Sequence, residues 1–348
     1  MTAPWPSPSS PGIIERKDMR YRPLGQSGIK VSEIGFGGWG IGGATPGATS
    51  YGSTDDKQSL AALAEALRLG ITFFDTSNVY GNGHSERLIG QALKGLGREV
   101  AVCTKAGCSD YGAPLDFSPA AIERSVAGSI ERLGRPIDLL LLHNPDPADL
   151  ALDAAVAAMA GLQACGKLHA FGISLRGPDD GWPVLERFPK IAAVEVNLNL
   201  LDQRAERSGF LKRAAGAGIG VIARTPLAFG FLSGAFRGNE GFDASDHRSR
   251  WPQAQLAKWS EGAGMFAGKF VQPGQTPVDL ALRYCLSCPG VVSAIPGILT
   301  PDEARQNARA SDLGPLDARV LNEIADLYDA NDFFVAPPKK DLPLAAKK

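Results

Sequence analysis

The sequence lacks the features that mark membrane, secreted and nucleic-acid-binding proteins. Its apolar runs, such as the four leucines at positions 139–142, fall far short of the roughly 20 residues that span a bilayer. Residues 1–11 are rich in Pro and Ser and contain neither a basic nor an apolar segment, so they do not resemble a secretory signal. With 36 Lys and Arg against 37 Asp and Glu, the net charge is -1, which provides no attraction for a polyanion. We therefore expect a cytoplasmic protein that binds neither membranes nor nucleic acids.

Cysteine and histidine are also scarce. The five cysteines are an odd number in a long chain without an export signal, which favours free thiols over disulfides. Cys285 and Cys288 form a single C-x-x-C pair with no second pair beside it, so we interpret them as core residues of a helix. Histidines at metal-ligand spacing are absent, which argues against a metal-dependent lyase or hydrolase; the four in the chain are His84, His143, His169 and His247. No metal site is expected.

The length of 348 residues would suit either two ordinary domains or one large α/β barrel. A hydrophobic fraction of 44% and a charged fraction of 21% indicate a folded chain with a large core. We expect a disordered leader over residues 1–19, a single barrel domain over residues 20–335 and a loose tail over residues 336–348.

Buried strands and amphipathic helices alternate along most of the chain. Helices are expected between Ser53 and Gly70, and near residues 85–94, 119–133 and 151–165, from capping residues and apolar positions three and four apart. Eight short apolar runs indicate strands, at residues 34–37, 71–75, 100–104, 138–142, 168–173, 191–196, 219–223 and 291–295.

This alternation predicts the fold class. Strands separated by helices pair in parallel through right-handed crossovers, and the first strand–helix junction lacks the G-x-G-x-x-G fingerprint of an open dinucleotide-binding sheet. We therefore predict an α/β protein with a (β/α)8 TIM barrel, an N-terminal hairpin that turns at residues 25–28, and an extra C-terminal helix at residues 316–327. Residues 228–276 interrupt the rhythm; long loops of this kind in barrels form lids or binding walls.

Four titratable residues stand at or just after the ends of predicted strands, where barrel enzymes carry their active sites. They are Asp75, Tyr80, Lys105 and His143. Taken singly, each is explained better by structure than by function: a cap, loop packing, a solvated strand end and a satisfied polar group. Taken together they indicate chemistry, because an Asp and a Lys buried at an apolar barrel mouth must pair.

The pairing suggests a role for each of the four residues. The Lys105 ammonium, held by Asp75, should lower the pKa of Tyr80 from its ordinary value of about 10. That would make Tyr80 a general acid, and His143 would donate a hydrogen bond to the same substrate oxygen.

At these residues the sequence resembles the aldo-keto reductase family over residues 20–307. The matching segments are GITFFDTSNVYG at 70–81, SERLIG at 85–90, TK at 104–105, LHNPD at 142–146, GKLHAFGIS at 166–174 and IPG at 295–297. The family's catalytic Asp, Tyr, Lys and His correspond to Asp75, Tyr80, Lys105 and His143. The resemblance implies a (β/α)8 barrel that transfers hydride from a nicotinamide cofactor to a small aldehyde or ketone, or oxidises the alcohol, without a metal.

The resemblance also implies which residues hold the nicotinamide half of the cofactor. Ser174 matches a family Ser that contacts the carboxamide, but Leu175 replaces the usual Asn and Glu195 replaces the usual Gln. Arg224 takes the place of an aromatic residue that stacks on the nicotinamide in many members, as a guanidinium plane also can. Contacts are further expected from the end of the first strand and from the segment over the pyrophosphate, namely Gly38, Trp39, Thr225, Pro226, Leu227, Phe229, Gly230 and Leu232.

The adenosine half is expected along the last strand and the helix after it, at Gly297, Thr300, Arg305 and Asn307. NADP-selective members usually carry a cation just after the Pro-Gly step, where this chain has Ile298 and Leu299. Arg305 is the only local cation, so NADP(H) is favoured only slightly over NAD(H).

One alternative function fits the same fold. Potassium-channel β-subunits resemble this family, so the chain could instead be a nucleotide-binding redox sensor or regulatory subunit. The complete set of four catalytic residues favours an enzyme. Neither the carbonyl substrate nor the oligomeric state follows from the sequence.

Overall fold

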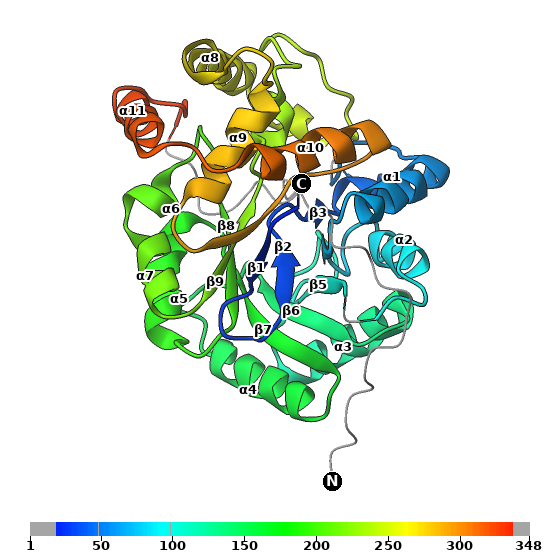
Figure 1. Ribbon diagram of the computed structural model, residues 1–348. Coiled ribbons are helices and arrows are strands. Elements are labelled where there is room, and N and C mark those ends of the chain that lie inside the picture. The colour runs from blue at the N-terminus through cyan, green and yellow to red at the C-terminus, as the bar shows by residue number, and fades with distance from the viewer. Residues whose placement is uncertain (1–18, 48, 98, 337–348) are drawn as a thin grey trace.

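The computed structural model describes residues 19–47, 49–97 and 99–336. Eight parallel strands form one sheet in the order β10-β9-β8-β7-β6-β5-β4-β3. Bridges from Ile34 to Ala294 and from Gly37 to Gly297 join its two edges, so the sheet closes into a barrel (Figure 1). The predicted (β/α)8 fold is confirmed; its strands are β3 (Phe36–Gly37), β4 (Phe73–Asp75), β5 (Ala101–Ala106), β6 (Ile137–His143), β7 (Leu168–Ser174), β8 (Ala193–Asn197), β9 (Gly220–Arg224) and β10 (Val291–Ile295).

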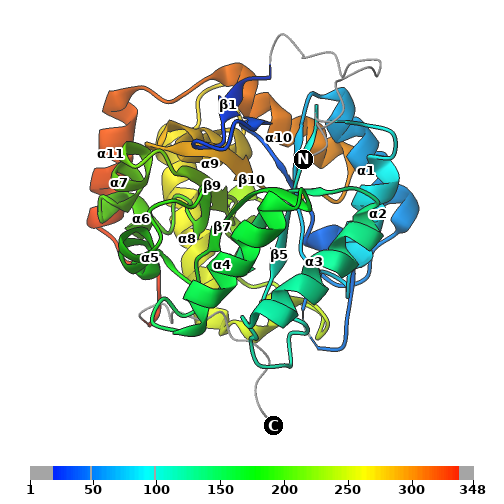
Figure 2. The same ribbon diagram turned by 90° about the horizontal axis from the view of Figure 1, so that it is seen from below.

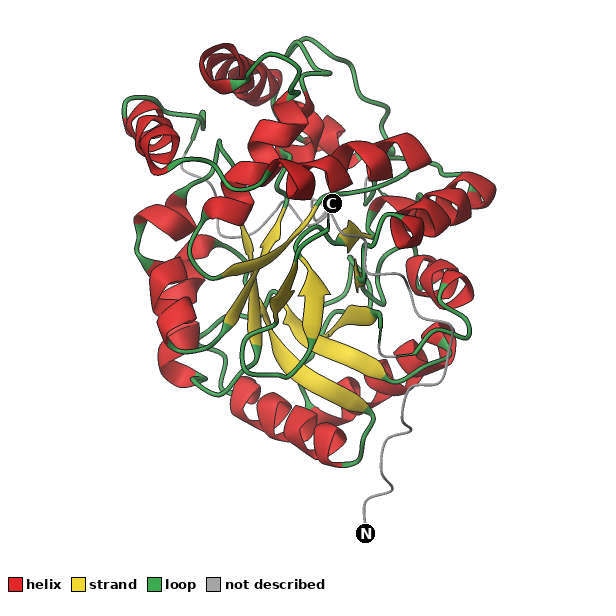
Figure 3. Cartoon of the chain, viewed as in Figure 1, coloured by secondary structure: helices red, strands yellow, loops and turns green. Residues whose placement is uncertain are grey.

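Helices surround this barrel, as Figure 3 shows. Local signals set their ends: the Asp55 side chain accepts from the Gln58 amide at the start of the first helix, and Gly134 adopts a positive φ after the third. The helices are α1 (Asp56–Arg68), α2 (His84–Ala92), α3 (Pro119–Leu133), α4 (Ala151–Ala164), α5 (Gly181–Arg187), α6 (Arg204–Arg207), α7 (Phe210–Gly216), α8 (Gln253–Phe270), α9 (Pro277–Ser287), α10 (Pro301–Leu313) and α11 (Ala318–Asp329).

The predicted hairpin covers one end of the barrel (Figure 2). Strands β1 (Tyr21–Pro23) and β2 (Lys30–Ser32) pair antiparallel, and Leu24 and Val31 pack on the side chains that fill the barrel interior. Gly25 allows this close approach, because a Cβ atom there would lie 2.4 Å from the Ala192 carbonyl oxygen. The hairpin thus closes the amino-terminal end of the strands and leaves the carboxyl-terminal end for a site.

Residues 228–276 contain more regular structure than the sequence analysis expected. They hold two short 3-10 helices, η3 (Ala228–Ser233) and η4 (His247–Arg250), and the 18-residue helix α8. Glycines within α8 masked it, yet its buried Leu256, Trp259, Ala263, Phe266 and Phe270 follow the helical spacing of three and four. The predicted extra C-terminal helix is present as α11, shifted by two residues at each end.

The predicted leader and tail fall outside the described residues, except for Met19, which is buried in the core, and Ala336. Within the described part of the chain, no helix is both long and apolar enough to cross a membrane. The five cysteines are free; Cys285 and Cys288 are buried in and beside α9, as expected of core residues.

Candidate active site

Two of the four candidate catalytic residues form a buried ion pair on neighbouring strands. Asp75 ends β4, and Lys105 lies one residue before the end of β5. The Lys105 Nζ atom donates to both Asp75 carboxylate oxygens at 2.7 Å and to the Thr76 carbonyl oxygen at 3.0 Å. Burial of a lysine is unfavourable unless it is paired, and this contact supplies the expected partner.

The turn after β4 places Tyr80 against the same lysine. The Lys105 Nζ atom lies 5.1 Å from the centre of the Tyr80 ring. Gly81 fixes the turn, because its φ is +60° and a Cβ atom there would lie 1.9 Å from the Gly42 carbonyl oxygen. This close approach to Gly42 holds the turn that carries Tyr80.

His143 ends β6 and faces Tyr80 across the barrel mouth. The two rings lie 6.2 Å apart, edge to face, and His143 Nδ1 is 3.3 Å from the Ser77 hydroxyl oxygen. Burial, together with the charges of Lys105 and Arg224, lowers the pKa of His143 well below its ordinary value. The imidazole is therefore neutral at neutral pH.

Burial also dominates the pKa values of the other three groups. It raises the pKa of Asp75 to about 7, with help from the Glu195 carboxylate and against the charge of Lys105. Burial opposes the charged form of Lys105, but the Asp75 and Glu195 carboxylates outweigh it and raise the pKa of Lys105 well above its ordinary value. Burial raises the pKa of Tyr80 as well, although Lys105 acts to lower it. The expectation of a lowered Tyr80 pKa was wrong for this structure, because loss of water around the phenol is the larger effect.

The four residues lie beside a cavity of about 440 Å³, which Asp75, Tyr80 and His143 line. Its walls are largely aromatic and apolar: Trp39, Tyr51, Tyr111, Leu115, Phe117 and Phe229. Only Trp39 and Phe229 among these were expected from the sequence. The others lie outside regular helices and strands, where the sequence has no periodic pattern that would predict their positions. The sequence indicated only that the site lies at the carboxyl-terminal end of the strands.

The predicted cofactor-binding residues divide into two groups. Those that line the cavity are Trp39, Asp75, Glu195, Arg224, Thr225, Phe229 and Gly297. Those that do not are Gly38, Ser174, Pro226, Leu227, Gly230, Leu232, Thr300, Arg305 and Asn307. Leu232 is buried in the core, and Gly38 supports the cavity indirectly, since its amide donates to the Asp75 carbonyl at 2.8 Å.

Glu195 lies on β8 beside the Lys105 ion pair. It is 2% exposed, and one carboxylate oxygen, Oε1, accepts from the Ser174 hydroxyl at 3.0 Å. The other oxygen, Oε2, lies 3.4 Å from Lys105 Nζ and has no hydrogen-bond partner among the described residues. The Arg224 Nε atom lies 4.0 Å from Oε1, and this nitrogen has no hydrogen-bond partner among the described residues.

The backbone after β9 is unusual where the phosphates of a dinucleotide were expected. Thr225, Ala228 and Phe229 have φ values of 51°, 46° and 58°, which non-glycine residues rarely adopt. Such conformations persist only where the surroundings hold them, and they concentrate at binding sites. This observation points to the same segment as the sequence analysis did.

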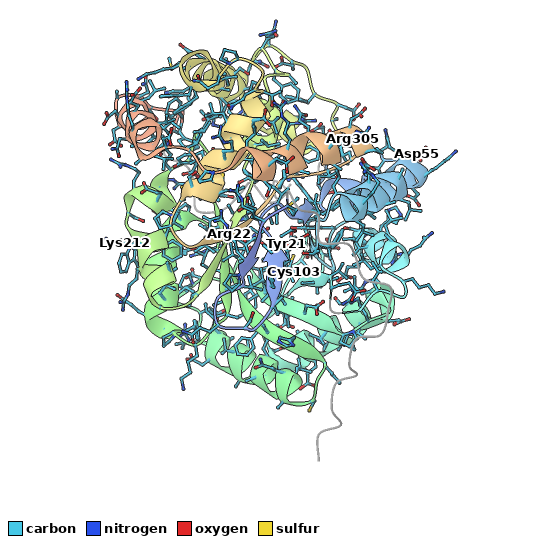
Figure 4. All side chains as sticks on the ribbon, in the orientation of Figure 1. Tyr21, Arg22, Asp55, Cys103, Lys212 and Arg305 are labelled. Atoms are coloured by element: carbon cyan, nitrogen blue, oxygen red, sulfur yellow. The ribbon has the colours of Figure 1, made fainter. Side chains whose placement is uncertain are left out.

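The expected adenosine end is occupied by the protein's own charges. Thr300 and Glu303 cap α10 reciprocally, and Glu303 Oε2 accepts from the Leu299 and Thr300 amides at 2.6 and 3.1 Å. Arg305 pairs with Glu65 on α1 at 3.0 Å and also with Asp302. Figure 4 shows Arg305 on α10 where this helix lies alongside α1.

One cluster has the composition of a metal site but contains a cation already. Asp75, Cys103 and Glu195 bring ligand atoms within 4.8 Å of one another. The Lys105 ammonium lies among them, and burial raises the pKa of Cys103 well above its ordinary value, which disfavours the thiolate that a metal needs. This arrangement does not fit a metal.

The residues do fit a nicotinamide dinucleotide. Two buried polar atoms of cavity-lining residues, Glu195 Oε2 and Arg224 Nε, have no hydrogen-bond partner among the described residues. Gly297 leaves space in the cavity, because a Cβ atom there would meet nothing closer than Tyr51, at 3.9 Å. Unsatisfied buried groups beside open space indicate a ligand that supplies hydrogen-bond partners.

Comparisons with known proteins agree with this geometry. The sequence pattern described as the Aldo/keto reductase family matches residues 33–329. The chain is 29% identical to aldo-keto reductase YhdN of Bacillus subtilis, over 93% of this chain and 99% of that protein. It is 29% identical to an NADH-specific methylglyoxal reductase of Escherichia coli, over 89% and 100%. The holo form of aldo-keto reductase AKR11C1 from Bacillus halodurans superimposes with a TM-score of 0.73 at 26% identity, covering 90% of this chain and 98% of that one.

The family match, the barrel and the relatives lead to one assignment. The family pattern covers most of the chain, and the two reductases align over nearly their whole length. The chain is therefore a member of the aldo/keto reductase family of oxidoreductases.

Proposed function

We propose that this protein reduces an aldehyde or ketone to the alcohol, and catalyses the reverse oxidation, with Tyr80 as the general acid. The observation that carries the proposal is the convergence of Tyr80, His143 and the Asp75–Lys105 ion pair on one cavity. A proton donor, a neutral hydrogen-bond donor and a fixed charge at a single barrel mouth are the groups that carbonyl reduction requires.

In this mechanism the carbonyl oxygen binds between Tyr80 and His143. Because His143 is neutral, one ring nitrogen carries a proton; if Nδ1 accepts from the Ser77 hydroxyl, that proton is on Nε2. His143 then orients and polarises the carbonyl, and Tyr80 transfers its phenolic proton to the oxygen as negative charge develops there.

Lys105 and Asp75 stabilise the phenolate that remains when Tyr80 gives up its proton. The Lys105 ammonium stabilises the phenolate, and the Asp75 carboxylate keeps that ammonium fixed and charged. The bound nicotinamide cofactor supplies the hydride for the carbonyl carbon. Ser174, Glu195, Arg224, Thr225, Phe229, Gly297 and Asn307 are the residues that would hold it.

For the cofactor we propose a weak preference between NAD(H) and NADP(H). A 2′-phosphate gains affinity chiefly from charge-assisted contacts, but Arg305 is paired with two carboxylates, and Glu303 already accepts from the Leu299 and Thr300 amides just before α10. We expect the two Kd values to lie within about a hundredfold, or roughly 2.7 kcal/mol. The NADH-specific relative supports acceptance of the cofactor without the phosphate.

The cavity walls favour a substrate with an apolar body. Trp39, Tyr111, Leu115 and Phe117 line the cavity together with Tyr80. Burial of apolar surface there would contribute most of the binding free energy, while the carbonyl oxygen fixes the orientation.

Turnover measurements test the proposal. Purified protein should first be titrated with NADH and NADPH by fluorescence, and then assayed for cofactor oxidation on a panel of aliphatic aldehydes, aryl aldehydes and ketones. Multiple turnovers on at least one apolar aldehyde are expected. Tight nucleotide binding with no more than a single slow turnover on every compound would contradict the enzyme and favour a redox sensor.

A further inference from the structure

Glu195 has a buried carboxylate of which only one oxygen is hydrogen-bonded within the described residues. Its Oε1 atom is hydrogen-bonded to Ser174, but Oε2 has no hydrogen-bond partner in the described chain. The side chain is 2% exposed and lines the cavity that also contains Tyr80 and His143. An acceptor in this state stabilises whatever donor or positive charge enters the cavity.

The nearby cations compensate Glu195 only in part. Lys105 Nζ lies 2.7 Å from both oxygens of Asp75 but 3.4 Å from Glu195, so one ammonium serves two carboxylates unequally. Arg224 Nε stays 4.0 Å away, and a terminal nitrogen of its guanidinium donates to the Leu175 and Arg176 carbonyls instead. The Glu195 carboxylate is therefore only partly compensated where it lines the cavity.

The two oxidation states of a nicotinamide cofactor differ in the charge that would meet this carboxylate. Loss of a hydride, with both its electrons, from the neutral reduced ring leaves a ring of charge +1. The rest of the molecule is unchanged, so a buried carboxylate beside the ring changes the relative affinity of the two states more than it changes general affinity.

We propose that Glu195 is a specificity-determining residue that strengthens binding of the oxidised cofactor relative to the reduced one. The proposal rests on the proposed function, since it requires the nicotinamide ring to bind in this cavity. By linkage, tighter binding of the oxidised state makes the bound reduced cofactor a stronger hydride donor. Glu195 thus favours the direction in which the carbonyl carbon accepts the hydride and Tyr80 protonates the oxygen.

The test compares dissociation constants, not turnover. Wild type, Glu195→Gln and Glu195→Asp should each be titrated with NAD⁺ and NADH, and with NADP⁺ and NADPH, by fluorescence or calorimetry without substrate. Glu195→Gln keeps the shape but removes the charge, and should weaken the oxidised state relative to the reduced one by at least about tenfold. That change corresponds to about 30 mV in the potential of the bound two-electron couple. Glu195→Asp retains the charge and should keep a ratio within about threefold of wild type.

Asp146→Asn provides the matched control, because Asp146 also lines the cavity but is half exposed and paired with Arg176. It should leave the ratio unchanged. If Glu195→Gln weakens both oxidation states equally, Glu195 is merely structural and the proposal is overturned. If wild type binds neither cofactor, the proposed function itself fails, which is a different result from binding with an unaltered ratio.

Discussion

Two buried glutamates at opposite ends of the barrel show how differently this protein treats a buried charge. Glu33, beside the hairpin, is fully buried, and both its oxygens are occupied: Oε1 accepts from Arg20 and Ser311, and Oε2 accepts from Arg22. Glu195, at the open end, has one oxygen bonded and one without a hydrogen bond among the described residues.

The difference separates structural charge from charge that is available to a ligand. At Glu33 the protein compensates the carboxylate with two arginines, so the group ties the amino-terminal segment to the barrel and to α10. At Glu195 the compensation is incomplete and the side chain faces a cavity. Burial alone does not identify a functional residue; burial with an unused hydrogen-bonding atom beside open space does.

Removal of the proposed proton donor, Tyr80, should have the largest effect. Tyr80→Phe is expected to lower kcat for carbonyl reduction by about 10²–10⁴-fold, the contribution of a general acid, while cofactor Kd values stay nearly unchanged. Tyr111→Phe is the matched control, because it removes a hydroxyl from the same cavity. A Tyr80→Phe enzyme that keeps more than about a tenth of kcat would exclude Tyr80 as the acid.

Neutralising Glu33 should mainly lower stability, whereas neutralising Glu195 should mainly change the ratio of cofactor affinities. Glu33→Gln should lower the free energy of unfolding by about 2–3 kcal/mol, because it removes the charge that pairs with Arg20 and Arg22 and turns one accepting oxygen into a donor, and should leave the ratio of cofactor affinities unchanged. Glu195→Gln should lower the free energy of unfolding by less than about 1 kcal/mol, because Glu195 makes only one well-formed hydrogen bond. Urea unfolding of both variants measures the two changes in the free energy of unfolding. Equal losses would show that the protein compensates both buried carboxylates to the same extent.

His247 allows a smaller effect to be tested through pH. It is packed among Trp39, Tyr51 and Phe229, and burial lowers its pKa to about 3, with smaller effects from neighbouring charges. Above its unfolded pKa of about 6.5 neither state is protonated; as the pH falls towards 3 only the unfolded state binds the proton, so stability is lost. Between pH 6 and 5 the unfolding free energy of wild type should fall by about 1 kcal/mol more than that of His247→Phe. Parallel pH curves for the two proteins would show that His247 is protonated in the folded state.

The smallest effect is expected at Arg305. Its guanidinium is half exposed and paired with Glu65 and Asp302, so Arg305→Ala should change the ratio of NADPH to NADH affinity by no more than about threefold. Fluorescence titration with both cofactors measures the ratio. A large shift towards NADH would show that Arg305 leaves its carboxylates to bind a 2′-phosphate.

The sequence predicted the regular parts of the molecule well. Buried strands such as 138–142 carry continuous apolar runs that the barrel requires, and a rule about strand ends then located Asp75, Lys105 and His143. The ion pair between Asp75 and Lys105 followed from the need to pair a buried charge.

Features that depend on long-range packing could not be predicted. The cavity residues Tyr51 and Tyr111 come from irregular segments, so no pattern places them beside Tyr80. The Tyr80 pKa depends on the balance between burial and Lys105, which only the structure provides. The pairing of Arg305 with Glu65 joins two helices far apart in the sequence, and without it Arg305 looked free to bind phosphate. Helix α8 was also not predicted, although its apolar positions follow the helical spacing; the glycines among them made the segment resemble a loop.

A double-mutant cycle on Tyr80 and Lys105 determines whether the two residues act as one catalytic unit. The cycle measures kcat for wild type, Tyr80→Phe, Lys105→Met and the double variant, with retained cofactor binding as the check on folding. If Lys105 acts only through the Tyr80 phenol, as proposed, Lys105→Met should be about as damaging as Tyr80→Phe, and the double variant should be no slower than either single one. Losses that multiply in the double variant, or a Lys105→Met enzyme with wild-type kcat and pH dependence, would contradict the account.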